Sequence, residues 1–308
     1  YSLSSLFKSN KRIRQAAEES GANYLFEASV GGGIPIIRPL CQCLAANYIE
    51  GIAGILNGTT NFILTMMIEK GMSFDEALKI AQEKGYAEKD PTADVEGYDA
   101  CRKVCILASL AFGKHVYPNQ VETEGITNIT LEDVSYIENA GGVIKLLGQI
   151  KYINDNEIAA FVSPAVVYNG SQLASVKDVF NAILVRGDAV GDVCFYGPGA
   201  GKLPTASAVV ADIIDCAKHS ERKKIFGWGA GAEDYVVDYK ERIEMPFYVR
   251  AKATPAEINA KFSDVKFLSR KGQPSDEVAF ITDIMTENKL NKKLDGINVI
   301  NTIKVTNY

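Results

Sequence analysis

The chain has 308 residues, of which 47% are hydrophobic and 23% charged, and its formal net charge is −5. This composition indicates a globular protein with room for two domains, and its mild acidity gives no electrostatic reason to bind nucleic acid or anionic lipid. No apolar run approaches the roughly 20 residues that span a bilayer, so we expect no membrane-spanning segment.

The cysteines and histidines are too scattered to indicate a metal centre. None of the six cysteines forms a Cys-x-x-Cys pair, and His115 and His219 are the only histidines of the sequence. This pattern argues against a Cys/His zinc site and favours reduced, buried thiols in a cytoplasmic protein.

The first residues lack the pattern of a secretion signal. Tyr1 is not an initiator methionine, and residues 1–7 contain neither a basic region nor a long apolar core. We therefore expect the chain to begin inside a longer polypeptide. Asn10–Gly21 then predicts a helix and Asn23–Val30 a strand, which together indicate an α/β layer.

Turn and capping residues divide the next part of the chain. Three glycines at 31–33 precede Ile34-Pro35, and Ser73 with Glu76 three residues later forms the pattern of a capping box. The expected elements are a helix around 38–46, a strand over 49–56, a helix over 62–69 and a helix over 73–84 that ends at Gly85.

A strongly apolar helix is expected over Asp99–Phe112, after an acidic loop that contains a proline. Between Val121 and Val193 the pattern predicts mixed short strands and helices, and hence an open sheet with one covered face. A glycine-rich turn at Gly197–Gly201 follows, and Thr205–Ser220 predicts a long helix rich in small residues.

The last part of the chain predicts a small unit of its own. Residues 228–245 are rich in glycine and then in charge, which indicates a linker. After it we expect a strand over 247–252, a helix over 255–262, strands over 265–268 and 278–281, a helix over 283–294 and a strand over 299–305. This order, βαββαβ, is that of the split βαβ motif.

Asp99 and Lys103 lie four residues apart, and hence on one face of a helix that is apolar over most of its surface. Buried charges are rare unless they are paired or functional. A structural ion pair is the simpler interpretation, and a proton-transferring lysine beside an aspartate is the functional one.

The loop before this helix is crowded with carboxylates, and Lys89 is the single basic residue among them. Such a cluster beside a buried lysine can bind an ammonium ligand, while a solvated acidic loop is the alternative. The spacing of a calcium-binding loop is absent. The acidic residues are Glu88, Asp90, Asp94, Glu96 and Asp99.

Two backbone turns are candidates for binding small groups. Gly31–Gly33 lacks the spacing of a dinucleotide loop and the lysine of a Walker motif, so we expect its carbonyl groups to face something small. Asn57–Thr60 lies at a strand-to-helix turn, where free N–H groups and a hydroxyl can hold a carboxylate or a carbonyl. Ordinary helix N-capping explains the same residues.

Four longer segments together resemble homoserine dehydrogenase. They are EASVGGGIPII (27–37), GILNGTTNFIL (54–64), GYAEKDPTADVEGYDACRK (85–103) and GPGAGKLPTASAVVADI (197–213), in the family's order. The resemblance implies an oxidoreductase that interconverts L-homoserine and L-aspartate 4-semialdehyde with NAD or NADP, in threonine, methionine and isoleucine biosynthesis. The C-terminal part, from residue 246, resembles a diverged ACT domain.

The resemblance also implies roles for single residues of this sequence. Lys103 matches the family's acid/base lysine, and Asp99 is its catalytic partner. Substrate contacts are implied for Glu88, Asp94, Asp99, Tyr86, Gly58 and Thr59, and cofactor contacts for Gly85 and Gly201. A monovalent cation, Na+ or K+, is implied at Glu27, Val30, Gly32 and Ile34, mostly through main-chain carbonyl groups.

The resemblance divides this α/β chain into parts. Residues 1–22 correspond to the remnant of a nucleotide-binding Rossmann domain, and 23–196 to an α+β domain for substrate binding, catalysis and dimerisation. Residues 197–227 form the turn and helix that return to the nucleotide-binding domain. A linker at 228–245 precedes an ACT-like regulatory domain at 246–308.

Two departures from the family pattern shape the expected function. No Gly-x-Gly-x-x-Gly segment occurs, so we expect the chain alone to be inactive and to bind the cofactor weakly. Lys252–Ile258 lacks the Pro-Gly pair usual at the ligand turn of ACT domains, where the family implies a threonine effector. We expect a homodimer or tetramer. The alternative is a truncated, non-catalytic paralogue that serves as an amino-acid-binding or regulatory module.

Overall fold

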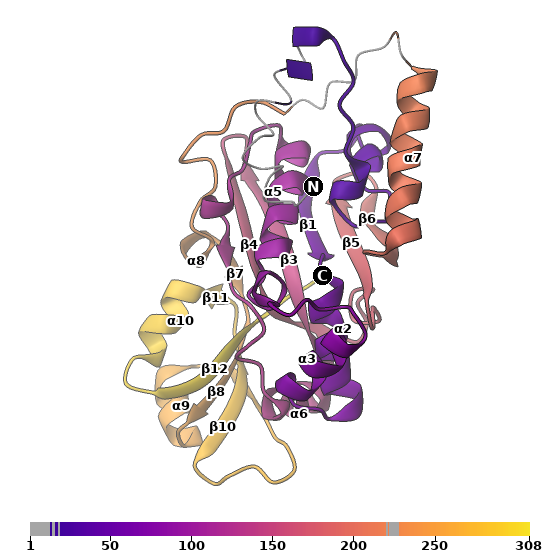
Figure 1. Ribbon diagram of the computed structural model, residues 1–308. Helices are drawn as coiled ribbons and strands as arrows, with labels where there is room; N and C mark the ends of the chain where they lie inside the picture. The colour runs from indigo at the N-terminus through magenta and orange to yellow at the C-terminus, as the bar shows by residue number, and fades with distance from the viewer. Residues whose placement is uncertain (1–12, 14–15, 18, 220, 222–227) are drawn as a thin grey trace.

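One large mixed sheet organises the molecule. The computed structural model describes residues 13, 16–17, 19–219, 221 and 228–308. Their main sheet has ten strands in the order β6-β5-β1-β3-β4-β12-β8-β10-β9, with β2 paired to β4 (Figure 1). The strands are β1 (Ile49–Ile55), β2 (Glu122–Thr123), β3 (Gly142–Asn154), β4 (Glu157–Tyr168), β5 (Phe180–Gly187), β6 (Gly191–Pro198), β8 (Phe247–Lys252), β9 (Val265–Leu268), β10 (Glu277–Thr282) and β12 (Asn298–Val305).

Helices cover this sheet, and α5 lies along strands β1, β3 and β4 (Figure 1). This architecture confirms the predicted mixed α/β class. No helix of the described residues is both long and apolar enough to cross a membrane. The longer helices are α2 (Gly58–Lys70), α3 (Phe74–Glu83), α5 (Tyr98–Phe112), α6 (Leu131–Asn139), α7 (Lys202–Lys218), α9 (Pro255–Lys261) and α10 (Glu287–Leu294); the short ones are η1 (Glu27–Ser29), η2 (Pro39–Cys43), α4 (Thr92–Val95), η3 (Pro118–Gln120) and α8 (Tyr239–Arg242).

Local signals give several of these helices correctly. Ser73 caps α3 and forms the predicted capping box with Glu76, since both reciprocal hydrogen bonds are present. The apolar helix α5 begins at Tyr98, one residue before the predicted start. Residues 13, 16–17 and 19–20 are helical, and the rest of the helix predicted over 10–21 lies outside the described residues.

The strand predicted over Asn23–Val30 is wrong. Only a single 3-10 turn, η1, forms there, and the segment belongs to no sheet. The backbone N–H of Glu27 donates to Oδ2 of Asp212 on α7 at 2.9 Å instead of to a neighbouring strand. The ring of Phe26 lies edge-on to Trp228, with centroids 6.0 Å apart. Side-chain contacts from distant parts of the chain therefore replace strand pairing.

The region over 121–193 contains a short strand and a helix, β2 and α6, as the mixed pattern predicted, but most of it forms two hairpins of long strands. β3 pairs antiparallel with β4 along almost its whole length, and β5 pairs antiparallel with β6. The strand β4 is buried on both faces, and its sequence is a nearly continuous apolar run. The strand β3 is buried over most of its length although it contains Lys145, Gln149 and Lys151, so neither sequence shows a clear period of two. That missing alternation is why short mixed elements were expected.

The sheet is open, as predicted, with β6 and β9 at its edges. Its second face is covered as well, so the prediction of a single covered face is wrong. Ala53, Leu147 and Leu184 on that face are fully buried. They share one hydrophobic cluster with Leu173 to Val176, in the loop after β4, and with Tyr308 near the chain end. Apolar surface that would otherwise need a partner subunit is thus buried within the chain.

The C-terminal strands and helices follow the predicted βαββαβ order, but the last helix begins four residues later than expected. Met285 and Thr286 pair with β7 (Glu244–Met245) as strand β11 (Met285–Thr286), and the Thr286 side chain then caps α10. These strands continue the main sheet, because β12 runs parallel to β4 with Lys304 opposite Ala165.

The segment predicted as a linker, 228–245, lies on the sheet rather than away from it. Val236 forms a bridge with Ile158 of β4, and the ring of Tyr239 stacks on Phe161 with the ring centroids 4.2 Å apart.

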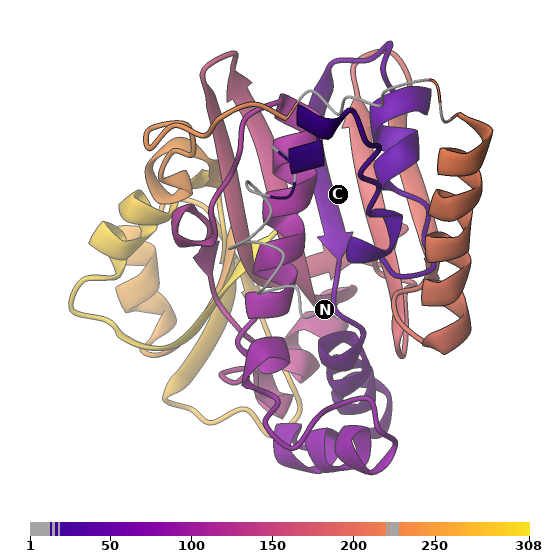
Figure 2. The same cartoon turned by 45° about the horizontal axis from the view of Figure 1, so that its top comes forward.

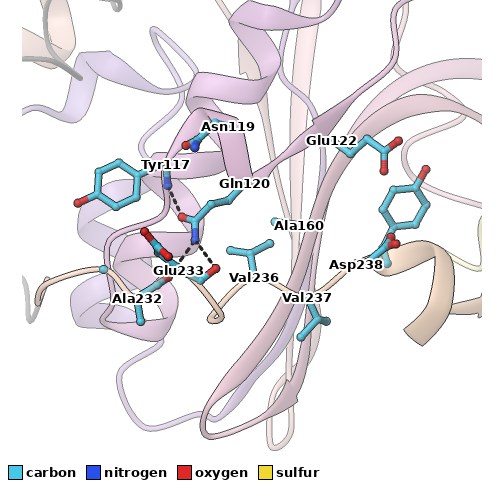
Figure 3. A pocket seen from close by; sticks show the side chains of 12 residues that line it. Tyr117, Asn119, Gln120, Glu122, Ala160, Ala232, Glu233, Val236, Val237 and Asp238 are labelled. Atoms are coloured by element: carbon cyan, nitrogen blue, oxygen red, sulfur yellow. Dashed lines mark hydrogen bonds between the residues drawn. The ribbon is translucent and has the colours of Figure 1, made fainter.

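A pocket of about 920 Å³ lies between the segment 228–245 and η3, and the residues that line it include Tyr117, Gln120 and Glu233 (Figure 3). None of the residues that the family resemblance assigns to a site lines it.

Helix α7 stands at the edge of the molecule beyond β5 and β6, and both views show it there (Figure 2). None of its residues is buried. Several large apolar side chains are exposed on it, with 79% for Leu203, 61% for Ile213 and 50% for Val210. The helix therefore presents an uncovered apolar surface, larger than an isolated exposed side chain would give.

A buried polar cluster joins α6 to the C-terminal strands. Asp133 is completely buried and accepts hydrogen bonds from Tyr248 Oη at 3.0 Å and from Asn301 Nδ2 at 2.8 Å. Nε of Arg250 lies 3.1 Å from Asp133 Oδ1 but is not directed along a hydrogen bond, so we treat that contact as an ion pair. Removing one partner of a buried ion pair is costly because the other charge stays buried.

We expect Asp133→Asn to lower the free energy of unfolding by ~3 kcal/mol, since Arg250 would lose its buried counter-ion. Urea denaturation followed by circular dichroism measures the change. Asp192→Asn is the matched control, because Asp192 pairs with Arg186 at 2.6 Å on the surface and such pairs contribute less than ~1 kcal/mol. Equal losses in both variants would contradict a structural role for the junction.

Candidate active site

The site is organised around the turn between β1 and α2. Asn57 has extended backbone angles and caps α2, with its Oδ1 accepting from the backbone N–H of Thr60 at 2.9 Å. The capping interpretation of this turn is therefore correct. It does not exclude binding, because the N–H groups of Gly58 and Thr59 in the first turn of the helix have no intrahelical partner.

The same Asn57 side chain joins two acidic residues from different segments. Its Nδ2 donates to Oδ1 of Asp94 at 2.7 Å and to Oδ2 of Asp99 at 2.9 Å. Asn57 is 5% exposed, so these contacts are formed away from bulk water. Sequence reasoning missed this role. The available signal was that a capping asparagine uses only its oxygen and leaves two N–H donors to be satisfied.

Lys103 lies beside these acids at the end of β1. Its Nζ donates to Asp99 Oδ2 at 2.6 Å and to the Leu56 carbonyl oxygen at 2.7 Å. The two side chains are 12% and 17% exposed. The ion pair predicted from the spacing of four is thus present, and the contact with Leu56 places the ammonium at the β1–α2 turn, where an i,i+4 pair alone would not put it.

The loop after α3 is held against α2 by two contacts. The hydroxyl of Thr59 donates to the Tyr86 carbonyl oxygen at 2.7 Å, and the Tyr86 ring packs edge-on against Phe62 with centroids 5.1 Å apart.

Burial raises the pKa of Asp94, the hydrogen bond from Asn57 opposes that shift, and the charge of Asp99 adds to it. Asp94 and Asp99 are therefore electrostatically coupled.

The five carboxylates of the acidic loop do not act as one cluster. Asp94 and Asp99 meet at Asn57, whereas Asp90 accepts from the hydroxyl of Thr92 at 2.6 Å at the start of α4. Glu88 is exposed, and its carboxylate forms no hydrogen bond or ion pair with the described residues. Of the predicted substrate contacts, Glu88 and Tyr86 are exposed, and the Tyr86 ring still packs on Phe62.

The two predicted cofactor glycines occupy turns that favour glycine. Gly85 follows the end of α3 with φ +73°, and Gly201 precedes α7 with φ +121°. Both are exposed, and a Cβ added at Gly85 would meet no atom within 4 Å. Backbone is accessible at both positions.

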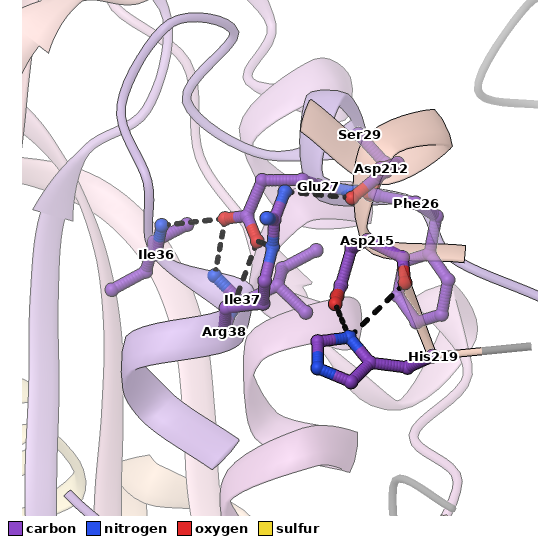
Figure 4. Close-up of polar contacts among 9 residues, drawn as sticks. All are labelled: Phe26, Glu27, Ser29, Ile36, Ile37, Arg38, Asp212, Asp215 and His219. Atoms are coloured by element: carbon purple, nitrogen blue, oxygen red, sulfur yellow. Dashed lines mark hydrogen bonds and ion pairs between the residues drawn. The ribbon is translucent and has the colours of Figure 1, made fainter. Parts of the chain in front are cut away.

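Glu27 lies beside Asp212 of α7, in a network of charged side chains (Figure 4). Its carboxylate is buried and accepts from the N–H groups of Ile36 and Ile37 at 2.7 Å each and from N–H and Nε of Arg38 at 3.0 and 3.1 Å. Four donors leave this carboxylate committed to the chain. Any cation at this position would be bound through backbone oxygen.

The same network anchors α7. Arg38 Nη2 donates to Asp212 Oδ1 at 2.8 Å. The contact of Asp215 Oδ1 with Nδ1 of His219, at 2.9 Å, lies within the C-terminal end of the same helix. Burial raises the pKa of Asp212, while the backbone N–H of Glu27 and the charge of Arg38 oppose that shift. Polar contacts rather than apolar burial thus attach this helix to the sheet domain.

The triple-glycine loop packs tightly against the turn before α7. Gly31 and Gly32 have φ values of +74° and +54°, and a Cβ at Gly32 would lie 2.4 Å from the carbonyl oxygen of Gly199. Among the described residues, no hydrogen bond ends on the carbonyl oxygens of Val30, Gly32 or Ile34. These three predicted ligands are buried and have free acceptors.

The side chain of Asn181 faces the same turn. It is 1% exposed, and neither its Oδ1 nor its Nδ2 has a hydrogen-bond partner. A Cβ at Gly199 would lie 2.4 Å from Asn181 Oδ1. No cluster of three His, Cys, Asp or Glu side chains that could hold a metal occurs within the part of the chain that is described. A cation in this region would therefore be bound mainly by backbone carbonyl oxygens.

Known proteins share both the fold of this chain and the motifs of its sequence. A family model for homoserine dehydrogenase matches residues 35–214. A homoserine dehydrogenase of Synechocystis sp. is 50% identical over 206 residues, which are 66% of this chain and 48% of the relative, so the chain spans about half the length of such relatives.

Solved structures agree. The homoserine dehydrogenase of Thiobacillus denitrificans superposes with a TM-score of 0.86 and 36% identity over 98% of this chain and 74% of that one. A hyperthermophilic archaeal homoserine dehydrogenase mutant in complex with NADPH superposes with a TM-score of 0.59 and 30% identity over 71% of this chain and 63% of that one. Since the family model matches more than half of the 308 residues, the chain belongs to the homoserine dehydrogenase family.

Proposed function

We propose that the protein interconverts L-homoserine and L-aspartate 4-semialdehyde with NAD or NADP, in threonine, methionine and isoleucine biosynthesis. The observation that carries the proposal is the contact between Lys103 Nζ and Asp99, joined through Asn57 to Asp94 at the β1–α2 turn. This arrangement has a proton donor and two carboxylates within one hydrogen-bonded group. Membership in the family supports the same reaction.

The chain's own residues supply proton transfer and substrate binding. In the reducing direction, the ammonium of Lys103 donates a proton to the alkoxide oxygen that forms on the substrate. Asp99 holds that ammonium at 2.6 Å and keeps it at the end of β1. Asp94 and Glu88, together with Asp99, bind the substrate ammonium.

The N-terminus of α2 supports the other end of the amino acid. Free N–H groups of Gly58 and Thr59 at a helix start are suited to the substrate carboxylate. The Thr59 hydroxyl, which donates to Tyr86, keeps the acidic loop closed over this position. The acidic side chains would thus bind the substrate ammonium, and the N–H groups at the start of α2 would bind its carboxylate.

A nicotinamide cofactor supplies the hydride in this chemistry. Gly85 and Gly201 would lie beside its nicotinamide end, since both present accessible backbone. The bound NADPH in the archaeal relative supports this choice of cofactor. NADP and NAD are both compatible with these two positions, because glycine backbone does not contact the ribose 2′ position that distinguishes them.

A monovalent cation, Na+ or K+, fits the triple-glycine loop. Within the described part of the chain, the carbonyl oxygens of Val30, Gly32 and Ile34 accept no hydrogen bond, and the buried side-chain oxygen of the adjacent Asn181 has no partner. The Glu27 carboxylate is used by the chain, so Glu27 would contribute its backbone oxygen. Such a cation would hold the loop against the turn before α7.

We further propose the predicted organisation into domains and a homodimer or tetramer in the cytoplasm. Residues 23–196 would carry substrate binding, and 246–308 would act as an ACT-like regulatory domain with threonine as effector. Dimerisation would also use residues 23–196, whereas the exposed apolar side chains of α7, such as Leu203 and Ile213, would pack against the nucleotide-binding domain to which residues 197–227 return. Six free cysteines are consistent with a reducing compartment.

Lys103→Ala should lower kcat for homoserine oxidation by at least ~100-fold with the fold retained, because it removes the group that transfers the proton. Steady-state kinetics on a polypeptide that includes a nucleotide-binding domain measures the effect. Lys89→Ala, an exposed lysine of the same loop, is the control and should keep its turnover. Near-normal kcat in Lys103→Ala would assign the ion pair to structure alone.

Glu88→Gln should raise KM for homoserine more than KM for the cofactor, because the amide keeps the shape but loses the charge that pairs with an ammonium. The carboxylate is free in solvent, so its loss should not destabilise the fold. Glu96→Gln in the same loop serves as the control. Equal changes in both Michaelis constants would argue against a substrate contact.

The polypeptide 1–308 should bind NAD or NADP only weakly, since it contains no Gly-x-Gly-x-x-Gly turn for the pyrophosphate. Isothermal titration of each cofactor gives the affinity. Micromolar binding would show that the nucleotide site is already present in this chain. Binding of homoserine without cofactor, and without turnover at any length, would instead favour a non-catalytic amino-acid-binding module.

A further inference from the structure

Lys145 is an internal lysine of β3 that the proposed chemistry does not use. It is 2% exposed, and its Nζ donates to the Val176 carbonyl oxygen at 2.5 Å and to Asn61 Oδ1 at 3.1 Å. Within the described residues it forms no ion pair with a carboxylate. Burying an ammonium group without a counter-ion costs free energy, so the position of Lys145 requires an explanation.

The lysine determines how the Asn61 carboxamide is oriented. An ammonium only donates, so Asn61 must turn its oxygen toward Lys145 and its NH2 group away. That NH2 group then lies 3.3, 3.0 and 3.2 Å from the carbonyl oxygens of Val176, Asp178 and Phe180. Without the ammonium, a rotated carboxamide would bring its oxygen against these carbonyl oxygens.

The segment Val176–Phe180 lies directly behind the proposed substrate turn. The carbonyl oxygen of Val179 is 2.8 Å from the place where a Cβ on Gly58 would lie. Asp178 has φ +53°, the single positive φ among non-glycine residues of the described chain, and its N–H donates to Thr65 Oγ1 of α2 at 3.1 Å. Contacts from α2 thus hold a backbone conformation that is uncommon for non-glycine residues.

We propose that Lys145 is a positioning residue for the substrate site: by orienting Asn61 it clamps Val176–Phe180 against α2 and sets the position of Gly58. The proposal deepens the proposed function and rests on it. Lys145 touches neither the reacting atoms nor the substrate, and it acts through one side chain and one backbone segment.

The electrostatics of Lys145 agree with this role. Burial, and then the charge of Lys177, lower the pKa of Lys145 to about 8, while Glu69 and Asp178 act in the opposite direction. The ammonium is therefore the main form of Lys145 at pH 7, although nearby negative charges offset its burial only weakly. Its hydrogen bonds to Asn61 and Val176 are what remain to stabilise it.

The test compares Lys145→Met with Lys151→Met in the 1–308 chain. Lys151 is six residues further along β3, hence on the same face, but it lies beside the ring of Tyr308, 6.0 Å away, and not beside α2. We expect Lys145→Met to speed amide hydrogen exchange of Thr60, Asp178 and Phe180 at least tenfold and to weaken homoserine binding in calorimetric titration at least fivefold. Lys151→Met should change neither by more than twofold.

Asn61→Asp is the second variant, because it keeps an acceptor for Lys145 and removes the donor to the three carbonyl groups. It should speed exchange at Asp178 and Phe180, and it decides the matter if Lys145→Met does not fold. Unchanged exchange in both variants, or unchanged homoserine affinity beside faster exchange, would overturn the proposal. Failure of the unmodified chain to bind homoserine would refute its substrate assignment, and the exchange rates would still decide whether Lys145 positions Gly58.

Discussion

The carboxamide of Asn57 connects three separate segments of the chain, and the arrangement of the candidate site depends on it. Its oxygen caps α2, and its nitrogen donates to Asp94 in the loop and to Asp99 on α5. Two carboxylates close together repel each other, and a shared donor reduces that repulsion without adding a charge. Lys103 is then located through Asp99 and Leu56. A neutral residue therefore sets the geometry of the charged ones.

The turn that carries Asn57 is supported from the sheet side as well. Burial on both faces of β3 and β4 gives α2 a rigid base, and the loop after β4 fills the second face instead of exposing it. Close packing of this kind resists small displacements. Helix α7 has no buried residue and exposes several large apolar side chains. It is attached by a hydrogen bond from the backbone N–H of Glu27 to Asp212 and by the ion pair between Arg38 and Asp212.

Sequence patterns predicted those parts of the fold whose signals are local. The capping box at Ser73, the apolar helix α5 and the βαββαβ order needed only neighbouring residues. The strand expected over 23–30 failed because contacts with Asp212 and Trp228, both far along the chain, decide its conformation. Local propensity cannot represent such contacts.

The candidate site shows the same division. Spacing alone placed Asp99 and Lys103 on one helix face, and family motifs selected Gly58, Thr59 and Asp94. The bridging role of Asn57 requires knowing that the acidic loop returns to the β1–α2 turn, which no local pattern states. Lys145 is one of two lysines in the sequence of β3, and its acceptors come from two other segments.

The order of strands in the sheet has a consequence for folding during synthesis. β12 is the last strand in chain order, yet it lies in the interior of the sheet between β4 and β8. While a ribosome is still producing residues 169–297, the β4 edge that β12 will cover is unpaired. Unpaired edges of apolar strands invite association with other chains. Before β12 is added, β2 can already pair with Phe161 and Val162 of β4, while Ala165 and Val166 at the same edge still lack their strand partners.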